Sequence, residues 1–572
     1  MFRGLNRRVS AVVCCALVAI AVTAAGCTAG SPTPATTRDK GRATEPKNGG
    51  TLCYSIGEPD TLRPGSLQDD DGTQVAQAIF DSLTQVDFLD SELVLPSAAE
   101  TWTVSADSTV WTFTLDRDRK FHEGTPVTAA DFVYAWNRIA KECVRSSVSM
   151  TATVPSYPSE LSLVAGWDSV RSGVAPELSG VKAVDDLTLQ VTLVQPYADF
   201  DYVVAHPSLA PLLEKYVADG IDYEGTMVPF SEMPVGNGPF KMAAPWKHGR
   251  EIKVVRNGDY RGTNPHVDAV DFLISRDATA AYQSFRREKL DFAPVPRAEL
   301  ATAVTEFGES ANGYVANPQR QVLRGAENTL HFLAFNGADA RLRDPALRRA
   351  ISLAVNRKAV CETVFDGVRL PADNAVPPGV AGYQESGWAD ARTDVAAASA
   401  ALREANSYKD RSALVLSYET GQDGYETATS IRSDLATIGI GVTLEAVERG
   451  TFRSRLQAGS FQFALASGTV ENPTMDSALV PLFGRESTGN VSRFSNDAFE
   501  RGVDSARATV PWNTRIARYL ELNYVVQQTN PIAPLAFGRH HHIASDRVHG
   551  LVHSAQNLTD FSRVWLDEDK DE

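Results

Sequence analysis

The segment from Trp111 to Ile139 constrains the fold more than any other part of the sequence. Trp111, Phe113 and Leu115 alternate with threonines, which is the pattern of a strand with one buried face. After a charged turn, Thr128 can cap a helix with Asp131 three residues further on. The apolar side chains that follow recur on one face of this helix, namely Phe132, Trp136, Ile139 and Ala140. A strand, a turn and a helix in direct succession indicate a mixed α/β fold.

Strand and helix patterns alternate in this way from Gly50 to the C-terminus, without an internal repeat. Further strands are predicted at residues 51–55, 187–193, 251–256, 413–418, 441–446 and 461–466. Helices are predicted at residues 75–83 and 430–438, and after Asp344, which is a candidate N-cap followed by Pro345. Because 572 residues are too many for one hydrophobic core, two or three lobes are expected.

The N-terminus has the pattern of a secretory signal. Three arginines precede the apolar run Ala11–Val22, which is too short to span a bilayer, and small residues follow up to Gly26. Ala24-Ala25-Gly26-Cys27 is similar to a bacterial lipobox, which implies that residues 1–26 are removed and Cys27 carries a lipid. A plainly secreted protein is the alternative, since Ala24 stands where a lipobox usually has Leu. Residues 27–49 are rich in Pro, Thr, Ser and Gly, and we expect a flexible tether.

Composition narrows the function classes. The formal net charge of −16 argues against a nucleic-acid surface, and no interior apolar run has the length of a membrane span. After removal of the signal and lipidation of Cys27, the remaining cysteines are Cys53, Cys143 and Cys361. At most one disulfide can form among them, and the sequence does not choose among the three pairings or exclude buried thiols.

Motifs of common enzyme and metal sites are missing from the sequence. It has no Gly-x-Ser-x-Gly elbow, no His-Glu-x-x-His helix and no phosphate-binding loop ending in Lys-Ser/Thr, so we predict that the protein is not an enzyme. His540, His541 and His542 are adjacent and point in different directions on a strand, so at most two of them can share a metal. We interpret them as surface residues and expect no cofactor.

Several short motifs carry a family resemblance, and they recur in the family's order along the chain. The first is Phe121-His122-Glu123-Gly124-Thr125-Pro126 with the strand and helix around it. The others are residues 49–52, 57–62, 181–186, 234–240, 256–260, 333–336, 348–350, 356–357 and 531–535. Together they resemble the bacterial extracellular solute-binding proteins of the oligopeptide, dipeptide and nickel class, from about Gly49 to the C-terminus.

The resemblance implies an α/β, bilobal periplasmic-binding-protein-like fold with three domains, of which the first is discontinuous. Domain I is expected at residues 50–78, 187–289 and 526–572, domain II at 79–186 and domain III at 290–525. A cleft between the lobes would close over the ligand by hinge rotation. The implied function is that of a lipid-anchored, monomeric binding component on the extracytoplasmic face of the cell membrane, which delivers oligopeptides or dipeptides to the permease and ATPase subunits of an ABC importer.

The resemblance also places the ligand site. In peptide-binding relatives, a loop with an acidic residue holds the peptide's amino end, and the matching loop here contains Ser467, Gly468, Thr469, Glu471 and Asn472. This loop lacks the family's Trp and Asp, so Glu471 is the only local carboxylate for the ammonium group. A solvated loop carboxylate is the alternative.

Four further residues are candidate ligand contacts. Arg449 stands where relatives often have an aromatic residue, and Asp69 and Asp70 lie where relatives present an edge of the first lobe. Tyr418 lies near the expected cleft. An exposed Arg449, an acidic surface loop and a core position for Tyr418 are the respective alternatives.

Two other functions remain open at this point. The altered amino-end loop also fits an envelope lipoprotein that keeps the scaffold for assembly or signalling without transport. The ligand of an importer can also be a metal complex, haem, an opine or a sugar instead of a peptide.

Overall fold

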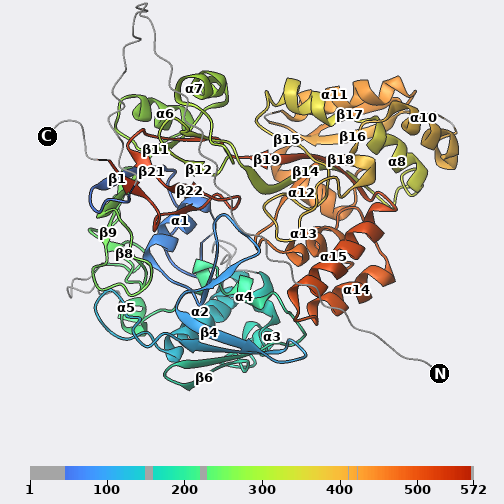
Figure 1. Cartoon of the computed structure of the whole chain (residues 1–572). Coiled ribbons are helices and arrows are strands. Elements are labelled where there is room, and N and C mark those ends of the chain that lie inside the picture. Colours follow the sequence, from blue (N-terminus) through green and yellow to red (C-terminus); the bar gives the residue numbers. More distant parts are fainter. Residues whose placement is uncertain are drawn as a thin grey trace, which may run out of the picture. The chain divides into compact units, whose positions relative to one another are not determined.

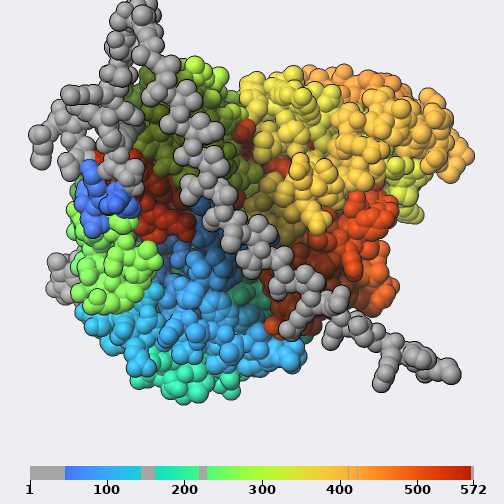
Figure 2. All heavy atoms as spheres, in the orientation of Figure 1, coloured from blue at the N-terminus to red at the C-terminus, as the bar shows by residue number. Residues whose placement is uncertain are grey.

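The largest sheet draws its seven strands from the start, the middle and the end of the chain. A computed structural model describes residues 45–67, 69–148, 159–219, 228–409, 411–421 and 423–567. The strand order is β13-β20-β11-β1-β10-β9-β8, and Figure 1 labels β1, β8, β9 and β11 of this sheet. The strands are β1 (Thr51–Ile56), β8 (Phe240–Met242), β9 (Glu251–Arg256), β10 (Ala269–Ile274), β11 (Phe292–Pro294), β13 (Val322–Leu323) and β20 (His542–Ala544). In Figure 2 the red C-terminal segment accordingly lies against green residues from the middle of the chain.

A second sheet of six strands is built from the residues between the β13 and β20 strands. Its order is β15-β19-β14-β18-β16-β17, with α8 (Pro345–Ala354), α10 (Val395–Glu404) and α11 (Gly424–Thr437) packed beside it (Figure 1). The strands are β14 (Ala326–Phe335), β15 (Leu370–Pro371), β16 (Leu414–Glu419), β17 (Val442–Val447), β18 (Phe463–Thr469) and β19 (Ile532–Arg539).

The chain passes between these two sheets at two short crossings, from β13 to β14 and from β19 to β20. The crossings are hydrogen-bonded to each other, because the Gly325 amide donates to Nε2 of His540 at 3.0 Å and the His540 amide donates to the Gly325 carbonyl at 3.1 Å. The buried hydrophobic side chains are divided between the same two parts of the chain. All buried members of two hydrophobic clusters lie between Leu330 and Phe537, and those of the other two clusters lie before or after that range. The expected α/β class with a discontinuous first domain is confirmed.

The opening strand and helix of the sequence belong to a four-stranded antiparallel sheet and its covering helix. The sheet order is β4 (Ala99–Val104), β5 (Val110–Leu115), β7 (Thr188–Thr192) and β6 (Val181–Asp185). The apolar side chains of β5 are buried as predicted. The backbone amide and hydroxyl of Thr128 both donate to the Asp131 carboxylate at 2.8 Å at the start of α2 (Ala129–Val148). The Asp131 half of the predicted capping box is therefore confirmed, whereas the Asp131 amide donates to the Thr128 carbonyl at 3.1 Å instead of to its hydroxyl.

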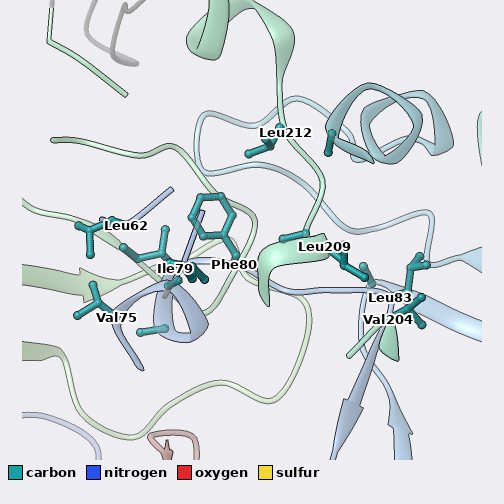
Figure 3. Close-up of a cluster of buried hydrophobic side chains, with 14 of the residues drawn as sticks. Leu62, Val75, Ile79, Phe80, Leu83, Val204, Leu209 and Leu212 are labelled. Atoms are coloured by element: carbon teal, nitrogen blue, oxygen red, sulfur yellow. The ribbon is translucent and has the colours of Figure 1, made fainter. Parts of the chain in front are cut away.

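Two of the family motifs contact each other. The His122 amide donates to the Gly236 carbonyl at 2.9 Å, and the Gly236 amide donates to Nδ1 of His122 at 3.2 Å. A Cβ on Gly236 would lie 2.2 Å from the carbonyl oxygen of Ile79, so only glycine fits against the end of the first helix. Figure 3 shows Ile79 and Phe80 in the hydrophobic cluster beside this contact, with Val204 and Leu209.

Most predicted elements have the correct type, and their ends differ. The first helix, α1, spans Asp70–Ile79 instead of 75–83, because the Asp69 side chain caps it by accepting from the Gly72 amide at 2.6 Å. The chain becomes extended at Phe80. The helix predicted at 430–438 is α11, which begins at Gly424, while the strand signals at 251–256 and 413–418 correspond to β9 and β16.

The remaining elements are short or belong to the periphery of the sheets. The helices are α3 (Trp167–Arg171), α4 (Phe200–Val203), α5 (Glu214–Asp219), α6 (Ala278–Arg286), α7 (Leu300–Phe307), α9 (Arg357–Ala359), α12 (Arg449–Ala458), α13 (Met475–Phe483), α14 (Asp497–Arg507) and α15 (Trp512–Gln527). The small sheets are β2 (Thr84–Val86) with β3 (Val94–Pro96), β12 (Val315–Ala316) with β22 (Leu551–His553) and β23 (Thr559–Asp560), and β21 (Val548–His549) with β24 (Trp565–Leu566).

Several predictions concern parts of the chain that the structure leaves undescribed. The signal at 1–26, the lipidated Cys27 and the tether up to residue 44 lie outside the described residues. Cys53 and Cys361 are free thiols, and the side chain of Cys143 is outside the described set. No helix in the described part of the chain is long and apolar enough to cross a membrane. The exact domain boundaries stay a prediction.

Candidate functional site

A cavity of about 210 Å³ lies where segments from both sides of the two crossings meet. One side contributes the start of α1 and the turn Ala555–Leu558 before β23. The other contributes Glu327, Asn328 and Thr329 at the start of β14 and the loop Thr469–Asn472 after β18. The cavity therefore lies between segments on the two sides of the crossings. A ligand cleft between two lobes was expected from the sequence.

The cavity is strongly acidic. Asp70, Glu327 and Glu471 line it, and the described lining residues include no Lys or Arg. Its only imidazole, His206, is neutral at pH 7, because burial lowers its pKa to about 4. An arrangement of carboxylates without cations favours a positively charged ligand.

The carboxylates are also poorly solvated. Burial raises the pKa of Asp70, and the neighbouring Asp71 raises it further. Burial likewise raises the pKa of Glu327, with the charge of Asp70 adding to the shift. The Asn557 side chain lies in the same cavity wall, and its amide lowers the pKa of both carboxylates and so opposes these shifts. Glu471 is accessible at the cavity wall, yet the surrounding protein displaces enough water to raise its pKa as well.

Buried amides in the cavity wall have unused hydrogen-bonding capacity. Asn472 is only 4% exposed, and its Nδ2 has no acceptor among the described residues. Neither polar side-chain atom of Asn328, which is 2% exposed, has a partner in the same part of the chain. Because an unsatisfied buried amide costs about 1–3 kcal/mol, these groups indicate a place for a polar ligand or ordered water.

A larger cavity of about 450 Å³ lies elsewhere, and its charges are already paired. The Arg119 guanidinium contacts the Asp81 carboxylate at 2.6 Å, and Arg563 contacts Asp87 at 2.7 Å and Asp560 at 3.0 Å. Its carboxylates therefore have cation partners from the protein itself. The smaller cavity, whose carboxylates form no ion pair within 4.0 Å among the described residues, is the better candidate for ligand binding.

Five of the residues predicted from the sequence meet at the smaller cavity. They are Asp69, Asp70, Thr469, Glu471 and Asn472. Asp69 has a structural use, since its carboxylate accepts from the Gly72 amide and, at 2.9 Å, from the Asp60 amide.

The other four predicted residues do not line this cavity. Ser467 and Gly468 lie in β18, where they pair with His331 and Leu330 of β14. Arg449 begins α12 and forms an exposed ion pair with Glu419 at 3.4 Å. Tyr418 is buried in the core beside α11. Direct ligand contacts of Arg449 and Tyr418 stay predictions.

Sequence reasoning missed Glu327 and Asn557. Neither residue lies in a motif, and 230 positions separate them in the chain. Asn557 has a φ of 59°, which places it in the left-handed region, where Asn is among the more tolerant residues. The sequence Ala-Gln-Asn predicts a turn at most, so only the fold reveals that this turn faces β14.

The interpretation of the three adjacent histidines as surface residues was wrong for His540, which is buried, while His541 and His542 are half-buried. His540 is 2% exposed and lies between the two crossings, where its ring accepts from the Gly325 amide. His542 stacks on Phe292 at 5.0 Å between ring centroids. Among the described residues, no group of three His, Cys, Asp or Glu side chains is placed to hold a metal ion.

Comparison with known proteins decides the family. The profile "Bacterial extracellular solute-binding proteins, family 5 Middle" matches residues 94–490. The chain belongs to this family. Proteins of the family bind solutes and are not enzymes, in agreement with the absence of catalytic motifs.

This family 5 protein has several characterised relatives. It is 27% identical to "Di/tripeptide-binding protein 2" of Pseudomonas aeruginosa, over 83% of this chain and 87% of that protein. It is also 27% identical to the "Dipeptide-binding protein" of Escherichia coli, over 77% of this chain and 81% of the relative. The structure of HbpA2 from Haemophilus parasuis matches with a TM-score of 0.78 at 24% identity, covering 91% of this chain and 100% of that one. The expected periplasmic-binding-protein-like fold is confirmed.

Proposed function

We propose that this family 5 protein is the peptide-binding component of an ABC importer and holds dipeptides or oligopeptides in the 210 Å³ cavity. The observation that carries the proposal is the acidic cavity formed by both sides of the two crossings. Relatives with similar length are named for binding dipeptides and tripeptides. A free peptide brings an ammonium group, which matches carboxylates that form no ion pair among the described residues.

Glu471 receives the amino end in this proposal. It lies in the loop that follows β18, two residues after Thr469. The hydroxyl of Thr469 is hydrogen-bonded to that of Thr329 at 2.9 Å, across the β14–β18 ladder. This ladder fixes the start of the loop. A charge-assisted hydrogen bond from a bound ammonium to Glu471 contributes about 1.5–3 kcal/mol.

The backbone of β18 offers a second means of recognition. β16 pairs with β18 only at Phe463 and Ala464, so Ser467 and Gly468 have a strand partner on the β14 side alone within the described chain. An extended peptide can add its backbone hydrogen bonds to such a free strand edge, and this mode is independent of the peptide's side chains. Ser467 and Gly468 then act through their backbone, in contrast to Glu471.

The two crossings supply the motion that an importer requires. Only the segments around Gly325 and His540 connect the two large sheets covalently, so a rotation there changes the separation of α1 from the β14 and β18 ends. A ligand that contacts both sides stabilises the closed state to the extent that it binds this state more tightly than the open state. The closed form is then recognised by the permease and its ATPase subunits.

Calorimetry with a simple dipeptide tests the binding function. Alanyl-alanine is expected to bind the mature protein, and N-acetylation of the peptide should weaken binding because it removes the ammonium charge. Glu471→Ala should lower the affinity for the free peptide more than tenfold, from loss of about 1.5–3 kcal/mol. Glu486→Ala, which removes a carboxylate outside the cavity, is the matched control. Equal affinities for wild type and Glu471→Ala would refute the ammonium anchor.

The lipid anchor is tested separately from the ligand. Cys27→Ala removes the only sulfur that a lipobox at residues 24–27 can modify. In a bacterial host that processes lipoproteins, we expect the wild-type protein in the membrane fraction and the variant in the soluble extracytoplasmic fraction. Retention of the variant in the membrane fraction would contradict lipidation at Cys27 and leave the peptide-binding proposal intact.

A further inference from the structure

The cavity has more negative charge than one peptide ammonium can compensate. Glu471 lies in the loop after β18, whereas Asp70 and Glu327 come from α1 and β14. If Glu471 takes the amino end of a peptide, Asp70 and Glu327 still require a counter-charge. No Lys or Arg among the described lining residues provides one.

Asp70 and Glu327 form a pair of their own. Both line the same cavity as Asn557, whose amide lowers the pKa of each carboxylate. The charge of Asp70 raises the pKa of Glu327, and Arg369, which is not among the lining residues, lowers it. Two carboxylates in one cavity, coupled in this way, favour either a shared proton or a bound cation.

The wall around the pair points to a polar guest independently of the charges. Asn472 is buried to 4% exposure, lines the cavity and leaves its Nδ2 without an acceptor among the described residues. Oδ1 of Asn557 is also buried without a donor in that part of the chain. An ammonium or guanidinium can donate to such an oxygen, and a ligand carbonyl can accept from Asn472.

We propose that the preferred ligand is a peptide with a basic side chain at its first or second residue, and that Asp70 and Glu327 together hold this second cation. This inference rests on the proposed peptide-binding function and specifies the ligand class. Lysine and arginine side chains both supply a permanent positive charge with several N–H donors. Asn557 lies in the same cavity wall, and Glu471 keeps the amino end.

A metal ion is a poorer occupant of this position. The described residues contain no group of three His, Cys, Asp or Glu side chains placed to coordinate one ion. Ca²⁺ takes six to eight oxygen ligands, typically from several carboxylates and carbonyls that converge on it. A monovalent organic cation needs only two or three hydrogen-bond acceptors, which the carboxylate pair provides.

Calorimetry with matched peptides tests the second cation site. The probes are Lys-Ala and Ala-Lys, each compared with the peptide in which norleucine replaces lysine and keeps the aliphatic stem. We expect at least one lysine peptide to bind about tenfold or more tightly than its norleucine counterpart, as a charge-assisted contact allows. Glu327→Gln and Asp70→Asn should bring the ratio of lysine-peptide to norleucine-peptide affinity close to one, whatever change they cause in the norleucine affinity itself.

The outcomes separate the two proposals. If norleucine and lysine peptides bind wild type equally, the second cation site is refuted and peptide binding stands. If no peptide binds, the proposed function itself fails. Should Glu327→Gln fold poorly, as judged by its thermal unfolding, the wild-type comparison and Asp70→Asn still decide. Titration with CaCl₂ alone is the metal control, and a calcium ion that displaces the lysine peptide would also overturn the inference.

Discussion

At the residue scale, three buried imidazoles stand out beside the crossings. The ring centroid of His553 lies 4.9 Å from that of His540 and 4.4 Å from that of His542. Burial lowers the pKa of His540 to about 4, and Arg539 adds to the shift. Burial also lowers the pKa of His542 and His553 well below the usual value, with the other histidines of the group adding to it. These rings are therefore neutral near pH 7.

Neutral buried histidines make stability depend on pH. In the unfolded chain each ring takes up a proton near pH 6.5, whereas the folded protein resists protonation until the pH is much lower. The unfolded state thus binds more protons between these values, and the free energy of unfolding falls as the pH falls below about 6.5. Each such histidine contributes a slope of up to about 1.4 kcal/mol per pH unit.

His553→Asn tests this dependence. The asparagine amide can still reach the Thr559 hydroxyl, which contacts Nδ1 of His553 at 2.9 Å, but it does not titrate. We expect a lower free energy of unfolding near pH 7, because the side chain is smaller, and a shallower loss of stability from pH 6.5 to pH 5. Urea unfolding at several pH values measures both. An unchanged slope would show that His553 is not neutral in the folded protein.

At the scale of single elements, the β13–β14 crossing depends on close packing at Gly325. A Cβ at this position would lie 2.2 Å from Cε1 of Tyr314 and 2.7 Å from Cε1 of His540. Tyr314 is itself fixed by a hydrogen bond from its hydroxyl to the Ala326 carbonyl at 3.0 Å. Movement of the Tyr314 ring would break its bond to Ala326, and movement of the His540 ring would break a bond between the two crossings.

Gly325→Ala is therefore expected to lower the free energy of unfolding by about 1–3 kcal/mol, as overpacking in a dense region does. Gly258→Ala is the matched control, because nothing lies within 4 Å of a Cβ at that position. Denaturant midpoints of both variants measure the difference. A Gly325→Ala variant as stable as the control would mean that the crossings can relax, and that they constrain the chain less than their hydrogen bonds indicate.

At the scale of the whole molecule, a buried polar network connects the two groups of hydrophobic clusters away from the crossings. The Arg507 guanidinium donates two hydrogen bonds to the Asp476 carboxylate, at 2.7 and 2.9 Å, and Tyr519 donates to the same carboxylate at 2.7 Å. On the other side, Asp199 pairs with Arg515 at 2.8 Å, and the Ala198 amide donates to the Arg507 carbonyl at 2.8 Å. The network ties the segment before α4 to α13, α14 and α15.

Removal of Arg507 tests the strength of this connection. Arg507→Leu leaves the buried Asp476 charge without its cation, and loss of one partner of a buried pair typically costs about 3–5 kcal/mol. Arg349→Leu removes an exposed ion pair with Asp390 and should cost at most about 1 kcal/mol. Thermal and urea unfolding measure both variants. Similar small losses in the two would show that the network contributes little to holding the clusters together.

Sequence patterns predicted helices and strands well where residues close together in the chain form the cap or the buried face. The Thr128–Asp131 capping box, the buried face of β5 and the Asp344 cap with Pro345 all depend on residues within a few positions of one another. The prediction of helix boundaries failed where an apolar pattern was followed instead of the cap. α1 starts earlier than its apolar pattern indicated because Asp69 caps it, and the apolar residues of 80–83 are buried by packing without continuing the helix.

By itself, the sequence determined the α/β class and the family and indicated the loop with Glu471 as a candidate site, because periodicity, caps and motifs are local properties of the chain. Only the tertiary structure decided that Asp70, Glu327 and Asn557 line one cavity, that His540 is buried and that His541 and His542 are half-buried. The physical reason is that charge, solvation and pKa depend on neighbours in space. In this chain those neighbours come from segments hundreds of residues apart, which β1, β14 and β20 bring together.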